Sequence, residues 1–143
     1  MITAIIPVRK GSQRVKNKNK KKFANSSLLE IKIKQLLELQ KRNKITEVIV
    51  SSDDQEMLDI AEKLGAMTHK RSEYHASSEA TNSEFFENLA ETVGKEHWIM
   101  YSPVTSPLIS IETYNEILSN FKNNPKNIVT VSNVKHHLWK DGK

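Results

Sequence analysis

Short aliphatic runs alternate along the chain with longer segments in which apolar residues recur every three or four positions. The short runs are typical of buried β-strands, and the longer segments predict amphipathic helices. Strands are expected at residues 3–8, 45–51, 66–69, 97–101 and 127–132, and helices at 27–40, 82–93 and 110–121. A further helix, with Met57, Leu58, Ala61 and Leu64 on its apolar face, is expected to end at Gly65, because glycine tolerates a left-handed terminal turn.

The order of these elements predicts a doubly wound α/β fold. Strands separated by helices of about 12 residues are joined by crossovers, which favours parallel pairing. We therefore expect a single domain, residues 1–143, with a mainly parallel sheet and helices on both of its faces. Ligands of such sheets bind beyond the carboxyl ends of the strands. The segments in which to search for a site are consequently 9–22, 51–54 and 102–107.

Composition narrows the chemistry available to the chain. Its 143 residues include no cysteine, which excludes disulfides, thiolate metal sites and a cysteine nucleophile. No apolar stretch approaches the roughly 20 residues of a membrane span, and the N-terminus lacks the basic start of a signal peptide. We therefore expect a cytoplasmic protein with no membrane partner. The net charge is +5, and five lysines crowd residues 16–22, which indicates an anionic ligand.

The segment after the first expected strand has the residue types of a phosphate-binding loop. Gly11 permits close approach of the backbone, and Arg9, Arg14 and Lys18 supply positive charge around it. A triphosphate needs backbone N–H groups, a forked guanidinium and a mobile ammonium. The segment is neither a P-loop nor a dinucleotide-binding fingerprint, because Gly11 stands alone. A solvated basic loop without a ligand is the alternative.

Two other pairs of polar residues are candidates for ligand binding. Asp53 and Asp54 follow the second expected strand and could hold Mg²⁺ or a ribose hydroxyl. An acid at a helix start is stabilised by the helix dipole without any ligand, so we expect Asp54 to have a structural or capping role. His136 and His137 point in opposite directions on a strand and do not make a two-ligand metal site. Together with Trp139 they are expected to line the sugar side of a pocket.

Several of these motifs resemble those of one enzyme family. Residues 5–19, IIPVRKGSQRVKNKN, are similar to the opening signature of the acylneuraminate cytidylyltransferases, the CMP-sialic acid synthetases. The resemblance continues in VIVSSDD at 48–54, AEKLGA at 61–66, Lys70 and Arg71 with Ala76, and TSPL at 105–108. It covers nearly the whole chain, and it implies the N-terminal part of a Rossmann-like nucleotide-diphospho-sugar transferase fold.

The resemblance implies transfer of CMP from CTP to a sialic-acid-like keto sugar acid, with release of pyrophosphate. Such a reaction is accelerated by positioning and by neutralising phosphate charge. Arg9 and Lys18 match the positions that hold the CTP phosphates in the family, and we expect them to be catalytic. The residues expected to bind the nucleotide are Arg9, Gly11, Ser12, Arg14, Lys18, Asn19 and Arg71. Mg²⁺ is the implied cofactor, and the family's aspartate ligands for it belong to a later portion that residues 1–143 do not include.

Two departures from the family pattern modify this expectation. Pro103 and Val104 stand where the family has Gln-Pro, so an amide that would contact the ligand is missing. Relative to the family the chain also looks truncated at its C-terminus, which predicts weak CTP binding and slow or no turnover. The sheet edge or face left uncovered suggests a homo-oligomer. A non-catalytic protein that binds CTP or a CMP-sugar is the alternative. A third hypothesis is an RNA-binding module that uses the lysines, although no nucleic-acid-reading motif follows them and we expect no nucleic-acid partner.

Overall fold

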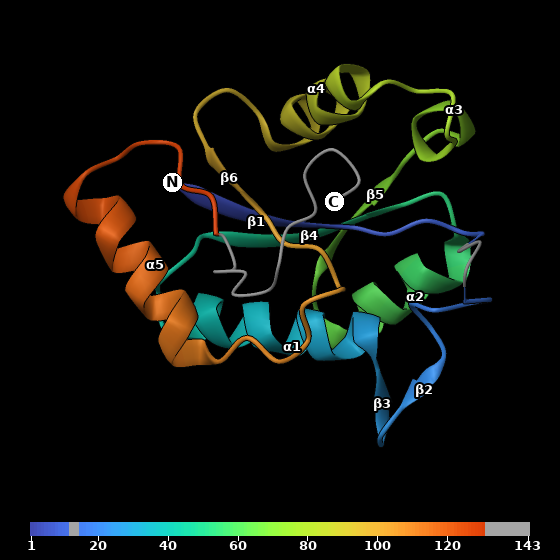
Figure 1. The fold of residues 1–143 in the computed structure, drawn as a ribbon, viewed down its shortest axis with the longest axis horizontal. Helices are drawn as coiled ribbons and strands as arrows, with labels where there is room; N and C mark the ends of the chain where they lie inside the picture. Colours follow the sequence, from blue (N-terminus) through green and yellow to red (C-terminus); the bar gives the residue numbers. More distant parts are fainter. Residues whose placement is uncertain (12–14, 131–143) are drawn as a thin grey trace, which may run out of the picture.

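A parallel sheet forms the centre of the fold. The structure is a computed structural model that describes residues 1–11 and 15–130. Within these residues the sheet has four strands, β1 (Ile2–Pro7), β4 (Glu47–Ser52), β5 (Met67–Lys70) and β6 (Trp98–Tyr101). Their spatial order is β5-β4-β1-β6, and each neighbouring pair is parallel. β1 and β4 thus lie inside the sheet, and β5 and β6 form its edges (Figure 1).

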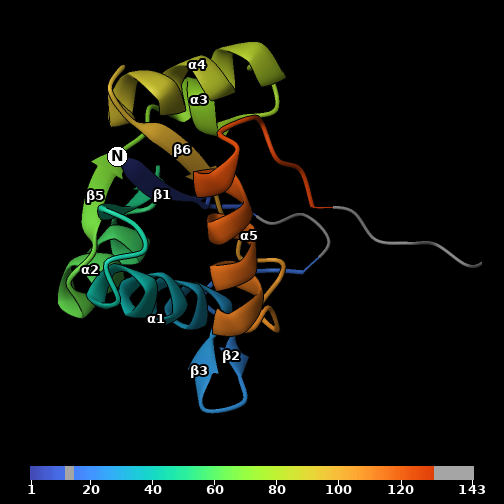
Figure 2. The ribbon, with the colours of Figure 1, turned by 90° about the vertical axis from the view of Figure 1, so that its left-hand side faces the viewer.

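Helices and a small hairpin connect the strands. The chain runs from β1 through the hairpin of β2 (Lys22–Phe23) and β3 (Ser26–Ser27) into α1 (Leu28–Lys41), and α2 (Gln55–Leu64) joins β4 to β5. α3 (Glu73–Ala76) and α4 (Asn82–Val93) precede β6, and α5 (Ile111–Asn123) follows it. Figures 1 and 2 show α3 and α4 on one side of the sheet, α1 and α2 on the other, and the hairpin projecting beyond α1. Within the described residues, none of the helices combines the length and apolar character needed to cross a membrane.

The strands direct alternate side chains into two cores. Ala4 and Ile6 of β1 belong to the larger core, to which α1, α2 and α5 also contribute. Ile5, which lies between them in the sequence, points to the opposite face and packs with Leu89 and Val93 of α4. Both faces of the sheet are therefore buried, which explains why β1 and β4 appear in the sequence as nearly unbroken aliphatic runs.

The start and end of α2 show how short sequence signals fix the position of a helix. Asp54 is its N-cap, and its Oδ1 accepts hydrogen bonds from the backbone N–H groups of Glu56 (2.9 Å) and Met57 (3.4 Å). Gly65 ends the helix with a φ of +90°, a value that suits glycine. The capping role expected for Asp54 and the expected end at Gly65 are both confirmed. The two acids Asp53 and Asp54 are thereby placed at the carboxyl end of the sheet.

The doubly wound parallel fold expected from the sequence is confirmed, and the differences lie at its periphery. The strand expected at 127–132 is wrong for residues 127–130, which adopt no regular structure, while residues 131 and 132 lie outside the described part of the chain. Ile128 and Val129 have a strand-like composition, but both are exposed and the structure gives them no partner strand. The hairpin and α3 were not expected, because elements of two to four residues are too short to show a period.

Candidate functional site

A cleft of about 540 Å³ opens at the carboxyl end of the sheet. Its first wall is the basic loop, residues 9–21, of which 9–11 and 15–21 are described. A second wall, residues 71–85, follows β5, and the third is formed by residues 103–105 of the 102–109 segment, which follows β6. The hairpin and α1 join β1 to β4, whereas α3 and α4 carry the chain from β5 to β6, and α1 and α4 contribute to opposite cores. The cleft therefore lies at the switch point where doubly wound sheets bind their ligands.

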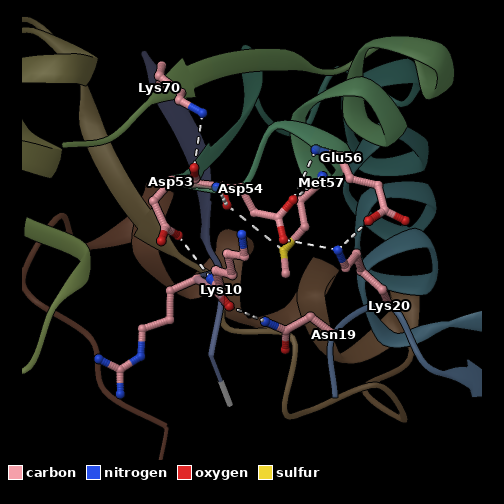
Figure 3. Close-up of polar contacts among 10 residues, drawn as sticks. Lys10, Asn19, Lys20, Asp53, Asp54, Glu56, Met57 and Lys70 are labelled. Carbon is pink, nitrogen blue, oxygen red and sulfur yellow. Dashed lines mark hydrogen bonds and ion pairs between the residues drawn. The ribbon is translucent and has the colours of Figure 1, made fainter. Parts of the chain in front are cut away.

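The basic loop is held against the sheet by contacts to its backbone. Lys10 donates its backbone N–H to Oδ1 of Asp53 (2.9 Å), and Nδ2 of Asn19 donates to the carbonyl of Arg9 (3.4 Å) (Figure 3). Asn19 is only 5% exposed, so this amide joins the two ends of the loop from inside the protein. Gly11 has a φ of +82°, which a residue with a Cβ adopts only with strain. The path of the loop is thus set by a glycine and by two polar side chains.

Lys20 fastens the end of the basic loop to the start of α2. Its ammonium lies between Asp54, at 3.0 Å from Oδ2, and Glu56 (Figure 3). The hydrogen bond to Glu56 raises the pKa of Lys20, and Asp54 adds to this effect against the opposing influence of burial. Burial acts to raise the pKa of Asp54, but the contact with Lys20 and the amides of α2 outweigh it and lower that pKa. The ammonium of Lys20 is therefore paired with two carboxylates of the protein, whereas Lys18 lines the cleft.

Positive charge gathers in the cleft without a balancing acid. Arg9, Lys18 and Arg71 line it, and no carboxylate is found among its described lining residues. Arg9 is exposed, and its Nη1 donates to the carbonyl of Ala76 across the cleft (3.2 Å). Lys18 is half-buried. Excess positive charge in a concave, partly desolvated site attracts an anion, and several phosphate oxygens would neutralise it.

Arg71 is buried in the wall of the cleft with part of its hydrogen-bonding capacity unused. The residue is 3% exposed, its Nη2 donates to the carbonyl of Val8 (2.6 Å), and its guanidinium carbon lies 5.3 Å from the centre of the Phe85 ring. Nε and Nη1 have no hydrogen-bond partner within the described residues. Burial lowers the pKa of Arg71, yet the group stays charged because a guanidinium is not deprotonated in proteins. Buried charged donors of this kind are available to an acceptor in the cleft, which a ligand oxygen or an ordered water can supply.

The 102–109 segment is held by side chains of α1 that the sequence did not single out. Lys32 is fully buried, and its Nζ donates to the carbonyl of Ser106 (2.9 Å) and to the hydroxyl of Tyr114 (2.6 Å). Nε2 of Gln35 donates to the carbonyls of Pro107 (2.8 Å) and Ile109 (3.0 Å). Burial lowers the pKa of Lys32 to about 8. A signal was present in the sequence, since a lysine three residues after Leu29 falls on the apolar face of the helix.

The structure brings four of the residues expected to bind the nucleotide into one cleft: Arg9, Lys18, Asn19 and Arg71. Gly11 lies next to it on the basic loop. Ser12 and Arg14 lie outside the described residues, as do His136, His137 and Trp139. Pro103 and Val104, where the expected amide is missing, line the opposite wall with Thr105. The part of the cleft near residues 103–105 therefore offers mainly apolar side chains.

The acids near the cleft do not fit a metal centre. Asp54 caps α2 and pairs with Lys20, and Asp53 accepts the N–H of Lys10. Across residues 1–11 and 15–130, no group of three or more His, Asp or Glu side chains is placed to hold a metal ion. The ligands of an implied Mg²⁺ are thus not supplied by the described part of the chain.

A parallel doubly wound sheet with a cationic cleft at its switch point defines an α/β protein suited to a phosphorylated ligand. Comparison with known protein families identifies the family to which it belongs. The family model described as cytidylyltransferase matches residues 3–139. The chain therefore belongs to the cytidylyltransferase family. No curated protein matches the chain in sequence.

Solved structures share its fold. A CMP:2-keto-3-deoxy-manno-octonic acid synthetase complexed with CTP superposes with a TM-score of 0.65 and 15% identity, over 87% of this chain and 49% of that one. A cytidylyltransferase from Leptospira borgpetersenii serovar Hardjo-bovis (strain JB197) gives a TM-score of 0.65 and 21% identity, over 87% of this chain and 50% of the other. At these identities the similarity shows the fold alone. The chain spans about half the length of each of these structures.

Proposed function

We propose that the cleft binds CTP and that the chain is the nucleotide-binding part of an enzyme that transfers CMP to a sugar acid. The observation that carries the proposal is the buried Arg71, two of whose nitrogens have no hydrogen-bond partner among residues 1–11 and 15–130, in a cleft that Arg9 and Lys18 also line. Three cations with no carboxylate among the described lining residues would offset most of the negative charge of a triphosphate. Membership of the cytidylyltransferase family supports CTP as the nucleotide.

The two ends of the cleft differ in chemistry, which suggests how CTP would lie. Arg9 and Lys18 extend from the basic loop, where a forked guanidinium and a mobile ammonium would bind phosphate oxygens. Phe85, Tyr101 and Pro103 offer apolar surface on the other walls, which suits a base or a ribose. In this arrangement Arg71 would donate its free N–H groups to an acceptor of the nucleotide deep in the cleft.

In the proposed reaction a hydroxyl oxygen of the sugar acid attacks the α-phosphorus of CTP. A new P–O bond to the sugar forms, the bond to the β-phosphate oxygen breaks, pyrophosphate leaves, and the hydroxyl proton passes to solvent or to a base. Arg9 and Lys18 would contribute by positioning the triphosphate and by offsetting charge that builds up on the leaving group. Mg²⁺ is the cofactor that the resemblance implies, and its ligands would have to come from outside the described residues, which do not fit a metal site.

We propose a sialic-acid-like keto sugar acid as the acceptor. The support is the resemblance of residues 5–19 and 105–108 to the acylneuraminate cytidylyltransferases. One structural neighbour is named as a synthetase for another keto sugar acid, 2-keto-3-deoxy-manno-octonic acid, so the two acceptors must be tested side by side. A role in the cytoplasmic synthesis of surface polysaccharides follows from this acceptor and is part of the same proposal.

Calorimetric titration of the 143-residue chain with CTP, UTP and ATP tests the binding proposal. We expect a preference for CTP and a loss of about 10- to 100-fold in CTP affinity in Arg71→Met, because charge-assisted hydrogen bonds contribute about 1.5 to 3 kcal/mol. Arg42→Met removes an exposed arginine and is the matched control, with unchanged affinity. A folded chain that does not bind CTP would contradict the proposal.

Pyrophosphate release, measured with CTP, Mg²⁺ and either sugar acid, tests the catalytic part. Release that depends on the sialic-acid-like acceptor supports the transferase. CTP binding without release supports the alternative, a non-catalytic protein that binds CTP or a CMP-sugar. Homo-oligomer formation is a separate expectation, for which sedimentation of the same sample is the test. Preferential RNA binding with a steep salt dependence would support the RNA-binding hypothesis instead.

A further inference from the structure

Lys32 occupies a position where an apolar residue would be expected. It is fully buried on the core-facing side of α1, near Leu29, Ile33 and Leu36. No ion pair with a carboxylate is found for it in the part of the chain that the structure describes. Burying an ammonium group without an acid is costly, and apolar replacements of buried charges are often neutral or stabilising. Stability of the fold alone is therefore a poor explanation for this lysine.

Besides its hydrogen bond to the hydroxyl of Tyr114, Lys32 contacts one wall of the cleft. Its ammonium reaches the carbonyl of Ser106, directly after the three residues 103–105 that line the cleft. One turn further along α1, Gln35 donates to the carbonyls of Pro107 and Ile109. All three acceptors are backbone oxygens, so the contacts fix the path of the segment whatever its side chains are.

The other end of the 102–109 segment is fixed by the sheet. Ser102 donates its backbone N–H to the carbonyl of Ile5 in β1 (2.9 Å). Residues 103–105 thus form a short bridge between the sheet and the two side chains of α1, with Val104 buried in the larger core. If the contacts from α1 were absent, the packing of Val104 and the hydrogen bond at Ser102 would remain, but the end of the segment after residue 105 would lose its hydrogen bonds to α1 and the wall would be less firmly fixed.

We propose that Lys32 and Gln35 are positioning residues for nucleotide binding, which hold the 102–109 segment where it closes the cleft. The proposal rests on the proposed function of the cleft and deepens it, because it assigns residues that do not touch the ligand. Without them the segment would have to be ordered when CTP binds, and the cost of this ordering would reduce the affinity. The buried charge is retained because it serves the cleft.

Three variants on one helix separate positioning from general stability. Lys32→Met keeps the length of the side chain and removes its donors, and Gln35→Leu removes the two bonds to Pro107 and Ile109. Gln40→Leu is the matched control, because Gln40 also lies on α1 and donates to a backbone carbonyl, that of Thr46 (2.9 Å), at the opposite end of the sheet. The measurements are the thermal midpoint, the Kd for CTP and hydrogen exchange of amides 103–109.

We expect Lys32→Met to have an equal or higher Tm and a Kd for CTP weakened by about tenfold, since one lost hydrogen bond to a charged group corresponds to about 1.5 kcal/mol. Gln35→Leu should bind several-fold more weakly, and both variants should exchange faster at 103–109. Gln40→Leu should lose stability without losing affinity. If Lys32→Met does not fold, the test is the comparison of the Kd for CTP of Gln35→Leu, expected to be weakened, with that of Gln40→Leu, expected to be unchanged.

The outcomes distinguish the two proposals. A folded wild-type chain that does not bind CTP would contradict the proposed function, and the positioning role with it. CTP binding that is strong in the wild type and unchanged in Lys32→Met and Gln35→Leu would contradict only the positioning role. If the affinity for CTP falls in proportion to Tm in all three variants, Gln40→Leu included, the positioning role is contradicted, because Lys32 and Gln35 then act only through the stability of the fold.

Discussion

Two walls of the cleft are held in place by different kinds of interaction. The basic loop is fastened by carboxylates, with Asp53 on the backbone of Lys10 and with Asp54 and Glu56 on Lys20. The 102–109 segment is fastened by donors of α1 to backbone carbonyls, and its principal donor, Lys32, is fully buried. Charge pairs near the surface are screened by salt, whereas buried contacts are screened much less. The wall that carries Arg9 and Lys18 is therefore the one that ionic conditions can adjust.

The two walls also differ in how their lysines affect the stability of the fold. The hydrogen bonds to Glu56 and Asp54 stabilise the charged form of Lys20 and raise its pKa. Burial, with no carboxylate beside it among the described residues, lowers the pKa of Lys32. One lysine stabilises the fold through its charge, and the other is charged at neutral pH at the expense of the fold. The three predictions below test this contrast, beginning with the largest expected effect.

The stability of the protein should increase with pH because of Lys32. Its pKa is about 8 in the folded protein and 10.5 ordinarily, so between these values the unfolded chain binds more protons and the free energy of unfolding rises. The full rise is about 3 kcal/mol, at about 1.36 kcal/mol for each unit of pKa difference, and the part that falls below pH 9.5 is about 2 kcal/mol. Urea unfolding of wild type and Lys32→Met, from about pH 7 to 9.5, measures it, and Lys32→Met should lack the rise.

Tyr114 sets the upper limit of that comparison. Its hydroxyl contacts Lys32, and burial raises its pKa above the ordinary 10.0, so the unfolded chain would release this proton first at higher pH. The experiment therefore stops below that value. Parallel stability curves for wild type and Lys32→Met would show that the buried ammonium carries no cost.

Removal of Asp54 should destabilise the other wall by a smaller amount. Asp54→Ala loses the cap of α2 and the partner of Lys20, and we expect a loss of about 2 kcal/mol in the free energy of unfolding. Asp54→Asn keeps a good capping residue and loses the charge, so about half of that loss should remain. Chemical denaturation measures both variants. Equal losses would mean that the cap contributes nothing, and no loss in Asp54→Asn would mean that the charge contributes nothing.

The salt dependence of stability should differ between variants of the two walls, and this is the smallest of the three expected effects. Lys20→Met should cost about 1 kcal/mol at low ionic strength, and the difference from wild type should shrink at about 1 M salt, where the Debye length is about 3 Å. The loss in Gln35→Leu, which removes bonds to neutral carbonyls, should stay the same. The expected contrast fails if both losses respond equally to salt.

The fold could be predicted from the sequence where a long period or a cap specifies an element. Six apolar positions of β1 and β4 alternate between two buried faces, and Asp54 and Gly65 bound α2, so these elements were correctly expected. The hairpin and α3 were missed because a few residues show no period. The strand expected at 127–132 was wrong for 127–130, because an aliphatic run forms a strand only when another strand is there to pair with it.

The candidate site could be predicted in part. Arg9 and Lys18 were named from the charge of the loop after the first strand, Asn19 and Arg71 from the resemblance to a family, and the structure places all four on one cleft. Their supports were missed, because contacts such as Lys32 to Ser106 join residues far apart in the sequence and use a backbone acceptor. No motif records such an acceptor. The lysine on the apolar face of α1 was the available signal.

The most direct test of the central claim is the affinity for CTP of two double variants with the same loss of charge. Arg9→Ala with Lys18→Ala removes two cations that line the cleft, and Lys16→Ala with Lys22→Ala removes two exposed lysines nearby. We expect the first pair to weaken binding at least about 100-fold and the second less than about threefold. Equal losses in two folded proteins, or no loss in the first, would contradict a triphosphate site in this cleft.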